Sequence, residues 1–447
     1  MNAGLAMTAS AAADAPMNDD APKAPKYFDA LPPATNVWRL ALPWLAAIPV
    51  LAVLPSIFGG TLGLSVISQI CIAVTFAVAY NLLLGGTGLL SFGHSLYFGV
   101  GAYTTAHLLN SAGERLPLIL LPIVGALAAM SLGAVLALFT VRKARVAFSM
   151  ISLAVGQLAY TLATVSKGFS GGDSGIRLDP TTAVSWGIDF GSPRAMYFLV
   201  AAWAWLAVLA MFLLLRTPLG KLMSATRDNA YRLEFLGFSP VLVRGLALTM
   251  SAGFAGIAGA LYALQFQVVT LDTLGLPQAT IVLLQTYIGG YTSFVGPIIG
   301  AILFTLASAN LSALSDAWPF YTYSASLVAV LFLPRGLSGW STDALGRWRA
   351  DLAQSGWRRA VVLRMLGVIC ATLMLGGYIG LAEMAQSLSA NDGRPVLVSL
   401  LGRDTVSPHR LVSWAGAGLL LLVGVWGLRR LRRGSAESQP AQAGGDH

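Results

Sequence analysis

Residues 81–108 read NLLLGGTGLLSFGHSLYFGVGAYTTAHL, and this stretch decides what kind of fold the chain adopts. It is long enough to lie within a bilayer, it holds six glycines, and it carries no formally charged side chain. Lipid offers no hydrogen-bond partners, so exposed backbone must be satisfied within the protein. The stretch therefore predicts a membrane segment that packs closely against its neighbours or breaks.

The composition of the whole chain points to a membrane protein with many spans. Charged residues make up 11% and hydrophobic residues 56% of the 447 residues, and the mean hydropathy is +0.71. Soluble domains carry roughly 25% charged residues. We therefore expect an all-α polytopic membrane protein. Cys71 and Cys370 lie in separate apolar runs, so they are interpreted as small hydrophobic residues and not as metal ligands.

Apolar segments suggest a core of about ten spans with two more appended. The core segments run over 39–58, 62–84, 88–110, 117–140, 146–166, 196–215, 245–269, 277–290, 294–312 and 320–333, and the appended ones over 360–382 and 411–428. Segments 277–290 and 294–312 almost touch and 320–333 is short, so re-entrant pieces are an alternative to full spans.

This pattern divides the chain into five parts. Residues 1–35 are rich in Ala, Pro and Asp and lack the basic start of a signal peptide, so they predict a disordered cytoplasmic tail. The transmembrane core is expected over 36–337. It is followed by a basic segment with tryptophans suited to a membrane surface (338–359), by two appended spans (360–430), and by a second disordered tail (431–447).

Basic residues are distributed unevenly between the two sides of the predicted spans. If the N-terminus lies inside, 21 of the 28 Lys and Arg residues fall on the inner side, whereas acidic residues divide 10 to 9. An excess of Lys and Arg in cytoplasmic loops is the rule for membrane proteins, so both termini are expected in the cytoplasm. Because these charges flank spans one loop at a time, no nucleic-acid partner is indicated.

Few ionisable side chains fall inside the predicted core. Acidic residues such as Asp272 lie in loops or at span ends, and Asn81 and Gln157 are neutral. Ion-coupled transporters usually bury such charges, so a pore of this kind is passive or is driven by another chain. His94 either lines the path of a solute or is hydrogen-bonded between packed helices, and the sequence favours neither interpretation.

Motifs for catalysis or nucleotide binding are absent from the sequence. It contains no GxxxxGK[ST] phosphate-binding loop, no HExxH, no GxSxG and no paired-carboxylate site. The chain is therefore not expected to be an enzyme or to bind a metal.

Residues 216–245, RTPLGKLMSATRDNAYRLEFLGFSPVLVRG, lie in an inner loop and predict one amphipathic helix. Asp228 and Arg232 stand four residues apart for mutual support, and Gly237 followed by Pro240 is expected to end the helix. Such a helix lies in the lipid interface or docks in a groove of a partner. Its apolar stripe follows three- and four-residue steps through Leu219, Leu222, Thr226, Ala230, Leu233 and Leu236.

Several short patches follow one another in order along residues 81–337. After the glycine-rich stretch come GGDSGI at 171–176, RTPLGK at 216–221, ATRDN at 225–229, SAGFAGIAGALYA at 251–263, Gly289-Gly290 before GPIIGA at 296–301, and LFLPRGL at 331–337. Together they resemble the signature of the permease subunits of branched-chain amino acid ABC importers, the LivM-like type. One departure is Ala230, where the family usually has Glu; Glu234 follows four residues later.

The resemblance implies partners. They are a second, LivH-like permease subunit, two ATP-binding subunits, a periplasmic substrate-binding protein and the lipid bilayer of the bacterial inner membrane. No cofactor is expected on this chain, because the partner subunits use the ATP. In the family a short cytoplasmic helix docks into the ATPase and transmits its closure. This assigns an ATPase-coupling loop to Lys221, Arg227, Asp228, Asn229, Arg232, Glu234 and Gly237.

Polar and glycine residues of the core are expected along a translocation path: Asn81, Gly85, Gly86, His94, Gln157, Gly289 and Gly290. The segments 84–93 and 288–296 are weakly alike, and paired glycine-broken segments point to a transport path. The predicted topology makes them a parallel repeat.

Other functions stay open at this stage. Relatives of the family carry other amino acids, urea or small amides, so the substrate is one of several. A stand-alone secondary transporter or facilitator is disfavoured by the shortage of intramembrane charge and by the amphipathic loop. A purely structural scaffold role would not explain why two membrane segments are broken by glycines.

Overall fold

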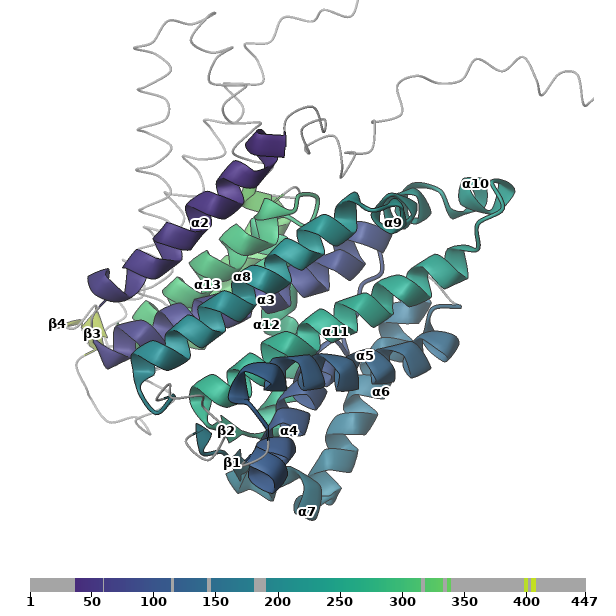
Figure 1. Cartoon of the computed structure of the whole chain (residues 1–447). Coiled ribbons are helices and arrows are strands. Elements are labelled where there is room, and N and C mark those ends of the chain that lie inside the picture. The colour runs from purple at the N-terminus through teal and green to yellow at the C-terminus, as the bar shows by residue number, and fades with distance from the viewer. Residues whose placement is uncertain are drawn as a thin grey trace, which may run out of the picture.

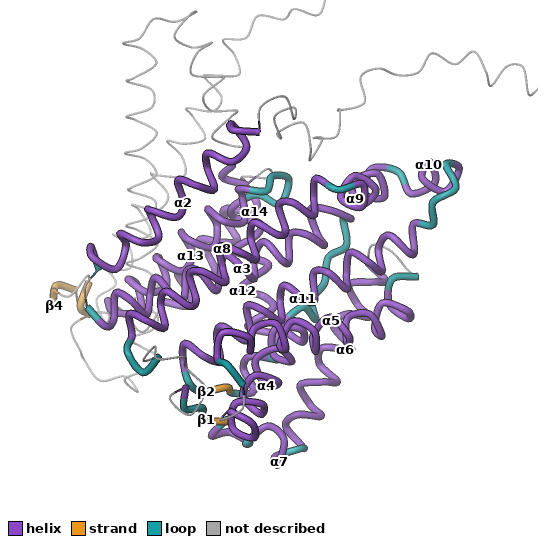
Figure 2. The backbone as a smooth tube through the Cα atoms, in the orientation of Figure 1, coloured by secondary structure: helices purple, strands orange, loops and turns teal. Residues whose placement is uncertain are grey.

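The computed structural model describes residues 37–58, 60–113, 116–142, 146–180, 190–314, 318–332, 336–338, 398–400 and 403–406. Figures 1 and 2 show that these residues form a bundle of helices with little other structure. The longer helices are α2 (Val37–Ile57), α3 (Thr61–Thr87), α4 (Ser95–Ala112), α5 (Leu121–Thr140), α6 (Val146–Val165), α8 (Pro193–Arg216), α11 (Pro240–Phe266), α12 (Leu276–Gly289), α13 (Val295–Leu314) and α14 (Trp318–Phe332).

The remaining elements are short. The helices are α7 (Lys167–Ser170), α9 (Pro218–Asp228), α10 (Ala230–Phe235) and the 3-10 turns η2 (Leu118–Leu120), η3 (Gly172–Ser174) and η5 (Leu271–Thr273). Two antiparallel pairs join β1 (Ile176–Arg177) to β2 (Val268–Val269) and β3 (Val398–Leu400) to β4 (Arg403–Val406).

Among the residues that the structure describes, six helices are long and apolar enough to cross a bilayer: α3, α5 with the turn before it, α6, α8, α11 and α13. The other predicted core segments correspond to α2, α4, α12 and α14. Helices α12 and α14 are shorter than 18 residues, α4 is less apolar, and the part of α2 whose side chains are described, Trp44–Ile57, is a shorter apolar stretch. The fold class of all-α polytopic membrane protein is confirmed. The predicted spans 360–382 and 411–428, most of the basic segment and both tails lie outside the described residues.

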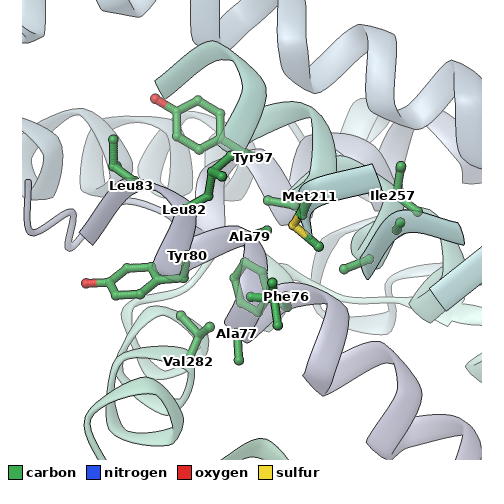
Figure 3. Close-up of a cluster of buried hydrophobic side chains, with 14 of the residues drawn as sticks. Phe76, Ala77, Ala79, Tyr80, Leu82, Leu83, Tyr97, Met211, Ile257 and Val282 are labelled. Atoms are coloured by element: carbon green, nitrogen blue, oxygen red, sulfur yellow. The ribbon is translucent and has the colours of Figure 1, made fainter. Parts of the chain in front are cut away.

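Helix α3 lies at the centre of the bundle. It is buried without interruption from Thr75 to Thr87. Figure 3 shows its side chains meeting Tyr97 of α4, Met211 of α8 and Val282 of α12. A helix that is apolar on all sides belongs in the interior, where every face meets another apolar surface. The other elements are therefore arranged around α3.

The glycine-rich stretch breaks the membrane segment. Helix α3 ends at Thr87, and Gly88 follows in the left-handed conformation with φ 73°. Glycine adopts this conformation without a steric cost, so it commonly ends a helix. The next helix begins at Ser95, so the prediction of a span that begins at residue 88 is wrong, and residues 88–94 form the connection.

Glycines bring α4 into backbone contact with its neighbours. A Cβ placed on Gly259 of α11 would lie 1.9 Å from the backbone oxygen of Phe98, and one on Gly101 would lie 2.2 Å from that of Gly256. Small residues allow such close approach between membrane helices. Both expectations for the stretch, close packing and a break, therefore hold.

A second glycine-broken segment separates α12 from α13, with Gly290 at φ 106°. The Thr286 hydroxyl of α12 lies 3.4 Å from the backbone oxygen of Ala77 in α3. Further along each of these two segments, Asn81 Nδ2 donates to the backbone oxygen of Ser293 at 3.3 Å. Helices α3 and α12 thus run side by side in the same direction, as a parallel repeat requires.

The two ends of the bundle carry different connections (Figure 1). Helices α9 and α10 lie at one end, which we call the α9 end. Strands β1 and β2 lie with α7 at the opposite end, the β1–β2 end, where Ile176 pairs with Val269. The predicted inner loop 216–245 and the predicted outer loop 171–176 thus lie at opposite ends, as the predicted topology requires.

Candidate functional site

Residues 216–244 form two short helices, and the prediction of a single amphipathic helix is wrong. Asn229 is extended, with φ −155° and ψ 100°, and this interrupts the helix after α9. Its side-chain oxygen then accepts from the backbone N–H of Arg232 at 3.0 Å, which caps α10. Gly237, with φ 83°, follows α10 as predicted, and Pro240 begins α11.

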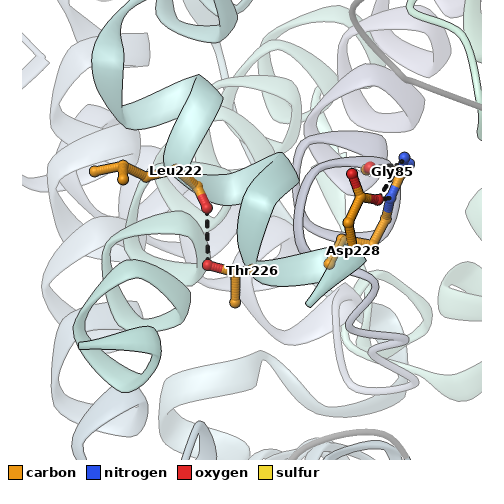
Figure 4. Close-up of polar contacts among 5 residues, drawn as sticks. Gly85, Leu222, Thr226 and Asp228 are labelled. Atoms are coloured by element: carbon orange, nitrogen blue, oxygen red, sulfur yellow. Dashed lines mark hydrogen bonds and ion pairs between the residues drawn. The ribbon is translucent and has the colours of Figure 1, made fainter. Parts of the chain in front are cut away.

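Arg227 ties α9 to the end of α3 (Figure 4). Its Nη1 donates to the backbone oxygen of Gly85 at 2.8 Å, and its Nε lies 3.4 Å from Asp228 Oδ1. The last carbonyls of a helix lack intrahelical partners and carry partial negative charge, so a guanidinium is stabilised there. The predicted pair of Asp228 with Arg232 is wrong, because the extended Asn229 interrupts the helical spacing.

The inner face of α9 is buried against the bundle. Met223 is fully buried, and the Thr226 hydroxyl donates to the backbone oxygen of Leu222 at 2.8 Å (Figure 4). Leu233 of α10 is also buried. Leu236 is 68% exposed, so the predicted apolar stripe is confirmed as far as Leu233 and is wrong at its last position.

The outer side of α10 is exposed and aromatic. Tyr231 is 77% and Phe235 88% exposed, and with Leu236 and Phe238 they form what we call the α10 patch. Neither Tyr231 nor Phe235 is among the predicted coupling residues, although both stand off the apolar stripe in the sequence. An exposed apolar cluster on a short helix marks a surface that a partner protein or the membrane interface covers. Four predicted coupling residues are exposed on the same two helices: Lys221, Asp228, Arg232 and Glu234.

His94 is buried where α3, α4 and α11 meet. Its Nε2 lies 3.2 Å from the Ser251 hydroxyl, which itself donates to the backbone oxygen of Ala79 at 2.6 Å. A hydroxyl has one proton to donate, so Nε2 is assigned as the donor to Ser251. The rings of Phe76 and Tyr97 lie 5.9 and 5.4 Å from the imidazole. The geometry therefore favours a histidine hydrogen-bonded between packed helices.

The other residues expected along the path lie near the α12–α13 turn, in the last turns of α3 or on α6. Asn81 is buried against the turn at Ser293, whereas Gln157 lies on the exposed face of α6. The four glycines lie where helices end: Gly85 and Gly86 in the last turn of α3, and Gly289 and Gly290 at the turn into α13. Asn81 and Gly290 thus meet the same turn, because the backbone N–H of Ser293 donates to the backbone oxygen of Gly290 at 3.4 Å, whereas Gln157 is on the exposed face of another helix.

The described core holds no ion relay. Among the residues that the structure describes, no Asp, Glu, Lys or Arg side chain is fully buried. Nor does that part of the chain gather three His, Cys, Asp or Glu side chains that could hold a metal ion.

Comparison with known proteins defines the class. A family model described as the permease component of branched-chain amino acid transport systems matches residues 62–334. The match covers more than half of the chain, so this protein belongs to that permease family. It is an integral membrane transport component, as the sequence patches predicted.

Two relatives are the high-affinity branched-chain amino acid transport system permease proteins LivM of Escherichia coli (strain K12) and of Salmonella typhimurium (strain LT2). The first is 27% identical over 300 residues, which covers 62% of this chain and 70% of the relative. The second is 27% identical over 292 residues, with 60% and 67% covered. No solved structure matches the chain.

Proposed function

We propose that this chain is the transmembrane permease subunit of an ATP-driven ABC importer that carries branched-chain amino acids across the bacterial cytoplasmic membrane. The observation that carries the proposal is the α10 patch, where Tyr231 and Phe235 are exposed beside a helix anchored on α3. A partner that binds this patch would act on the bundle through the hydrogen bond between Arg227 of α9 and Gly85 of α3.

In the proposed cycle, two ATP-binding subunits close on ATP and pull the coupling loop. The Arg227 contact passes the displacement to Gly85 at the end of α3. Helix α3 is buried on all sides beyond Thr75, and packed interiors transmit strain and do not absorb it. The displacement therefore reaches the connection 88–94 and changes the access of the pore.

The remaining parts of the importer are a second, LivH-like permease subunit and a periplasmic substrate-binding protein. The chain has no phosphate-binding loop, so it binds no ATP itself and the partner subunits use the cofactor. The transmembrane core spans 36–337, and both termini lie in the cytoplasm. Lack of a buried charged residue in the described core favours this function over an ion-coupled transporter.

Replacing both aromatic residues of α10 tests the docking surface. Tyr231→Ala with Phe235→Ala should abolish co-purification of the ATP-binding subunits while the chain still inserts, because interface anchors are large aromatic side chains. Phe139→Ala is the matched control, since Phe139 is 72% exposed near the end of α5 and outside the patch. Retention of the ATPase by the double variant would rule out this surface as its docking site.

Uptake by proteoliposomes that contain the whole transporter tests the activity and the substrate. Leucine uptake should require ATP hydrolysis and should be blocked by isoleucine and valine. Uptake that is equal without ATP would establish a facilitator instead. If urea or small amides inhibit uptake and leucine does not, the transporter carries urea or small amides instead of branched-chain amino acids.

A further inference from the structure

The guanidinium of Arg216, the last residue of α8, has one edge without a hydrogen-bond partner. Its Nε and Nη2 are buried and make no hydrogen bond within the part of the chain that the structure describes. Nor does any described carboxylate pair with it, since Asp228 in the next helix pairs with Arg227. Nε and Nη2 lie on the edge of the planar group that can donate to both oxygens of a carboxylate or a phosphate. Burying a charged edge without a partner is strongly unfavourable, so a group with oxygen atoms is expected there.

Aromatic side chains from three parts of the chain surround this guanidinium. Its central carbon lies 4.7 Å from the centroid of the Phe212 ring, one helical turn earlier in α8. The centroid of the Phe212 ring lies 5.1 Å from that of Trp44 in α2 and 5.4 Å from that of Phe294, just before α13. Stacking on a ring fixes the plane of a guanidinium and therefore the direction of its edge. The site is thus built by several elements and is not an isolated surface arginine.

The position of Arg216 along α8 places it at the boundary of the hydrocarbon. Helix α8 is a candidate span of 24 residues. A helix of this length rises about 36 Å, slightly more than the roughly 30 Å of hydrocarbon in a bilayer. Its last residue therefore stands at the level of the lipid headgroups, which carry phosphates. Arg216 is half-buried, so part of its side chain remains accessible from outside the bundle.

The charge near Arg216 favours a headgroup with a net negative charge. Residues 216–245 carry five basic and two acidic side chains. Lys221, in the helix that follows, is exposed. Basic residues near a membrane surface attract anionic lipids, whereas they repel the ammonium group of a zwitterionic headgroup. A phosphodiester without an ammonium group, as in phosphatidylglycerol, is therefore the ligand that matches the site.

We propose that Arg216 binds the phosphate of an anionic phospholipid, with Nε and Nη2 donating to two of its oxygens. Rotation about the bonds of this long, partly exposed side chain turns the edge toward a headgroup beside the bundle. The bound lipid would hold the junction of α8 and α9, where the Thr217 hydroxyl donates to the backbone oxygen of Leu214 at 2.6 Å. This site goes beyond the proposed function, because it does not depend on which solute the chain carries or on what drives transport.

Lipid titration of the purified full-length chain tests the site. The chain is stripped of lipid in detergent and titrated with short-chain phosphatidylglycerol, and native mass spectrometry measures the first lipid bound. Arg216→Gln should weaken this binding about tenfold, since a hydrogen bond to a charged group contributes at least that factor. Arg142→Gln is the matched control, because Arg142 is an exposed arginine just after α5. It should change the affinity less than about twofold, as exposed charges contribute little.

Equal affinities of the wild type and Arg216→Gln would overturn the site. Phosphatidylethanolamine with the same acyl chains should bind more weakly, and equal binding of the two lipids would overturn the choice of an anionic lipid. Excess inorganic phosphate should not displace the lipid, and displacement would assign the site to a free anion instead.

If Arg216→Gln cannot be purified, Arg216→Lys takes its place. An ammonium group lacks the planar edge that donates to two oxygens, so binding should still weaken about threefold. Unchanged affinity in Arg216→Lys would contradict binding through that edge.

Discussion

Individual glycines set how closely the helices of this bundle approach. At Gly259 a Cβ would lie 1.9 Å from the backbone oxygen of Phe98, so no side-chain rotation can make room for it. At Gly245, in the same helix, a Cβ would lie 3.8 Å from side-chain atoms of α5, which is ordinary contact. The same residue type therefore has different consequences at two positions of α11.

Gly259→Ala is expected to destabilise the fold. The backbones of α4 and α11 must separate to admit the methyl group, which costs about 1–3 kcal/mol, as overpacking does in other cores. The midpoint of thermal unfolding in detergent measures the effect. Gly245→Ala, the control, should leave the midpoint unchanged or slightly raised, because alanine favours a helix. Equal midpoints for the two variants would contradict the packing argument.

Arg227 acts at the same scale through a single hydrogen bond. Arg227→Ala leaves the Gly85 carbonyl without its guanidinium, and a hydrogen bond to a charged group contributes about 1.5–3 kcal/mol. If the displacement passes through this contact, leucine imported per ATP hydrolysed should fall about tenfold while the ATPase stays bound. Arg142→Ala, an exposed arginine just after α5, should leave the ratio unchanged. An unchanged ratio in Arg227→Ala would remove Arg227 from the coupling route.

At the scale of elements, α9 and α10 form a loop that packs against the bundle on one side and is exposed on the other. Asn229 separates the two helices and Gly237 ends the second. The side that packs against the bundle carries the buried residues Met223, Thr226 and Leu233, whereas the exposed side carries the α10 patch. The loop thus presents to a partner a surface whose position is fixed by α3.

Substitutions at Gly237 should act through the backbone alone. Nothing lies within 4 Å of a Cβ placed there, but φ is 83°, where a β-branched residue is strained by about 1–2 kcal/mol. We expect Gly237→Val to lower ATP-driven uptake more than Gly237→Asn, since asparagine tolerates this conformation. Gly168→Val in α7 is the control, because its site is equally open and has no positive φ. Equal uptake by both Gly237 variants would show that the backbone conformation of this turn does not determine how the coupling loop works.

For the whole molecule, the charge distribution and the two ends of the bundle define one orientation. The arginines and lysines of the coupling loop lie at the α9 end, and the glycine-rich turn 171–175 lies at the β1–β2 end. By the positive-inside rule, the excess of basic residues predicts that the α9 end faces the cytoplasm. The proposed ATPase and the binding protein would then meet opposite ends of the bundle.

Labelling from one side checks this orientation. In a chain without native cysteines, Ser174→Cys should react with an impermeant reagent in intact cells, and Glu234→Cys should react only in inverted vesicles. Both side chains are exposed, so burial does not limit either reaction. The reversed pattern would invert the topology and contradict the cytoplasmic coupling loop.

The sequence alone determined the class, the glycine breaks and the family of this protein. Those properties depend on composition and on local chemistry: apolar length predicts burial in lipid, and Gly88, Gly237 and Gly290 stand where the backbone needs a positive φ. Family patches are likewise local, since each is a short run of residues in a fixed order.

Only the tertiary structure decided which side chains face one another. A helical period predicted one stripe through Leu236, but Asn229 takes an extended conformation and turns Tyr231 and Phe235 outward. His94 and Gln157 looked equivalent as polar residues in apolar segments. One is enclosed by α3, α4 and α11 while the other is exposed on α6, because burial depends on neighbours that are distant in the chain.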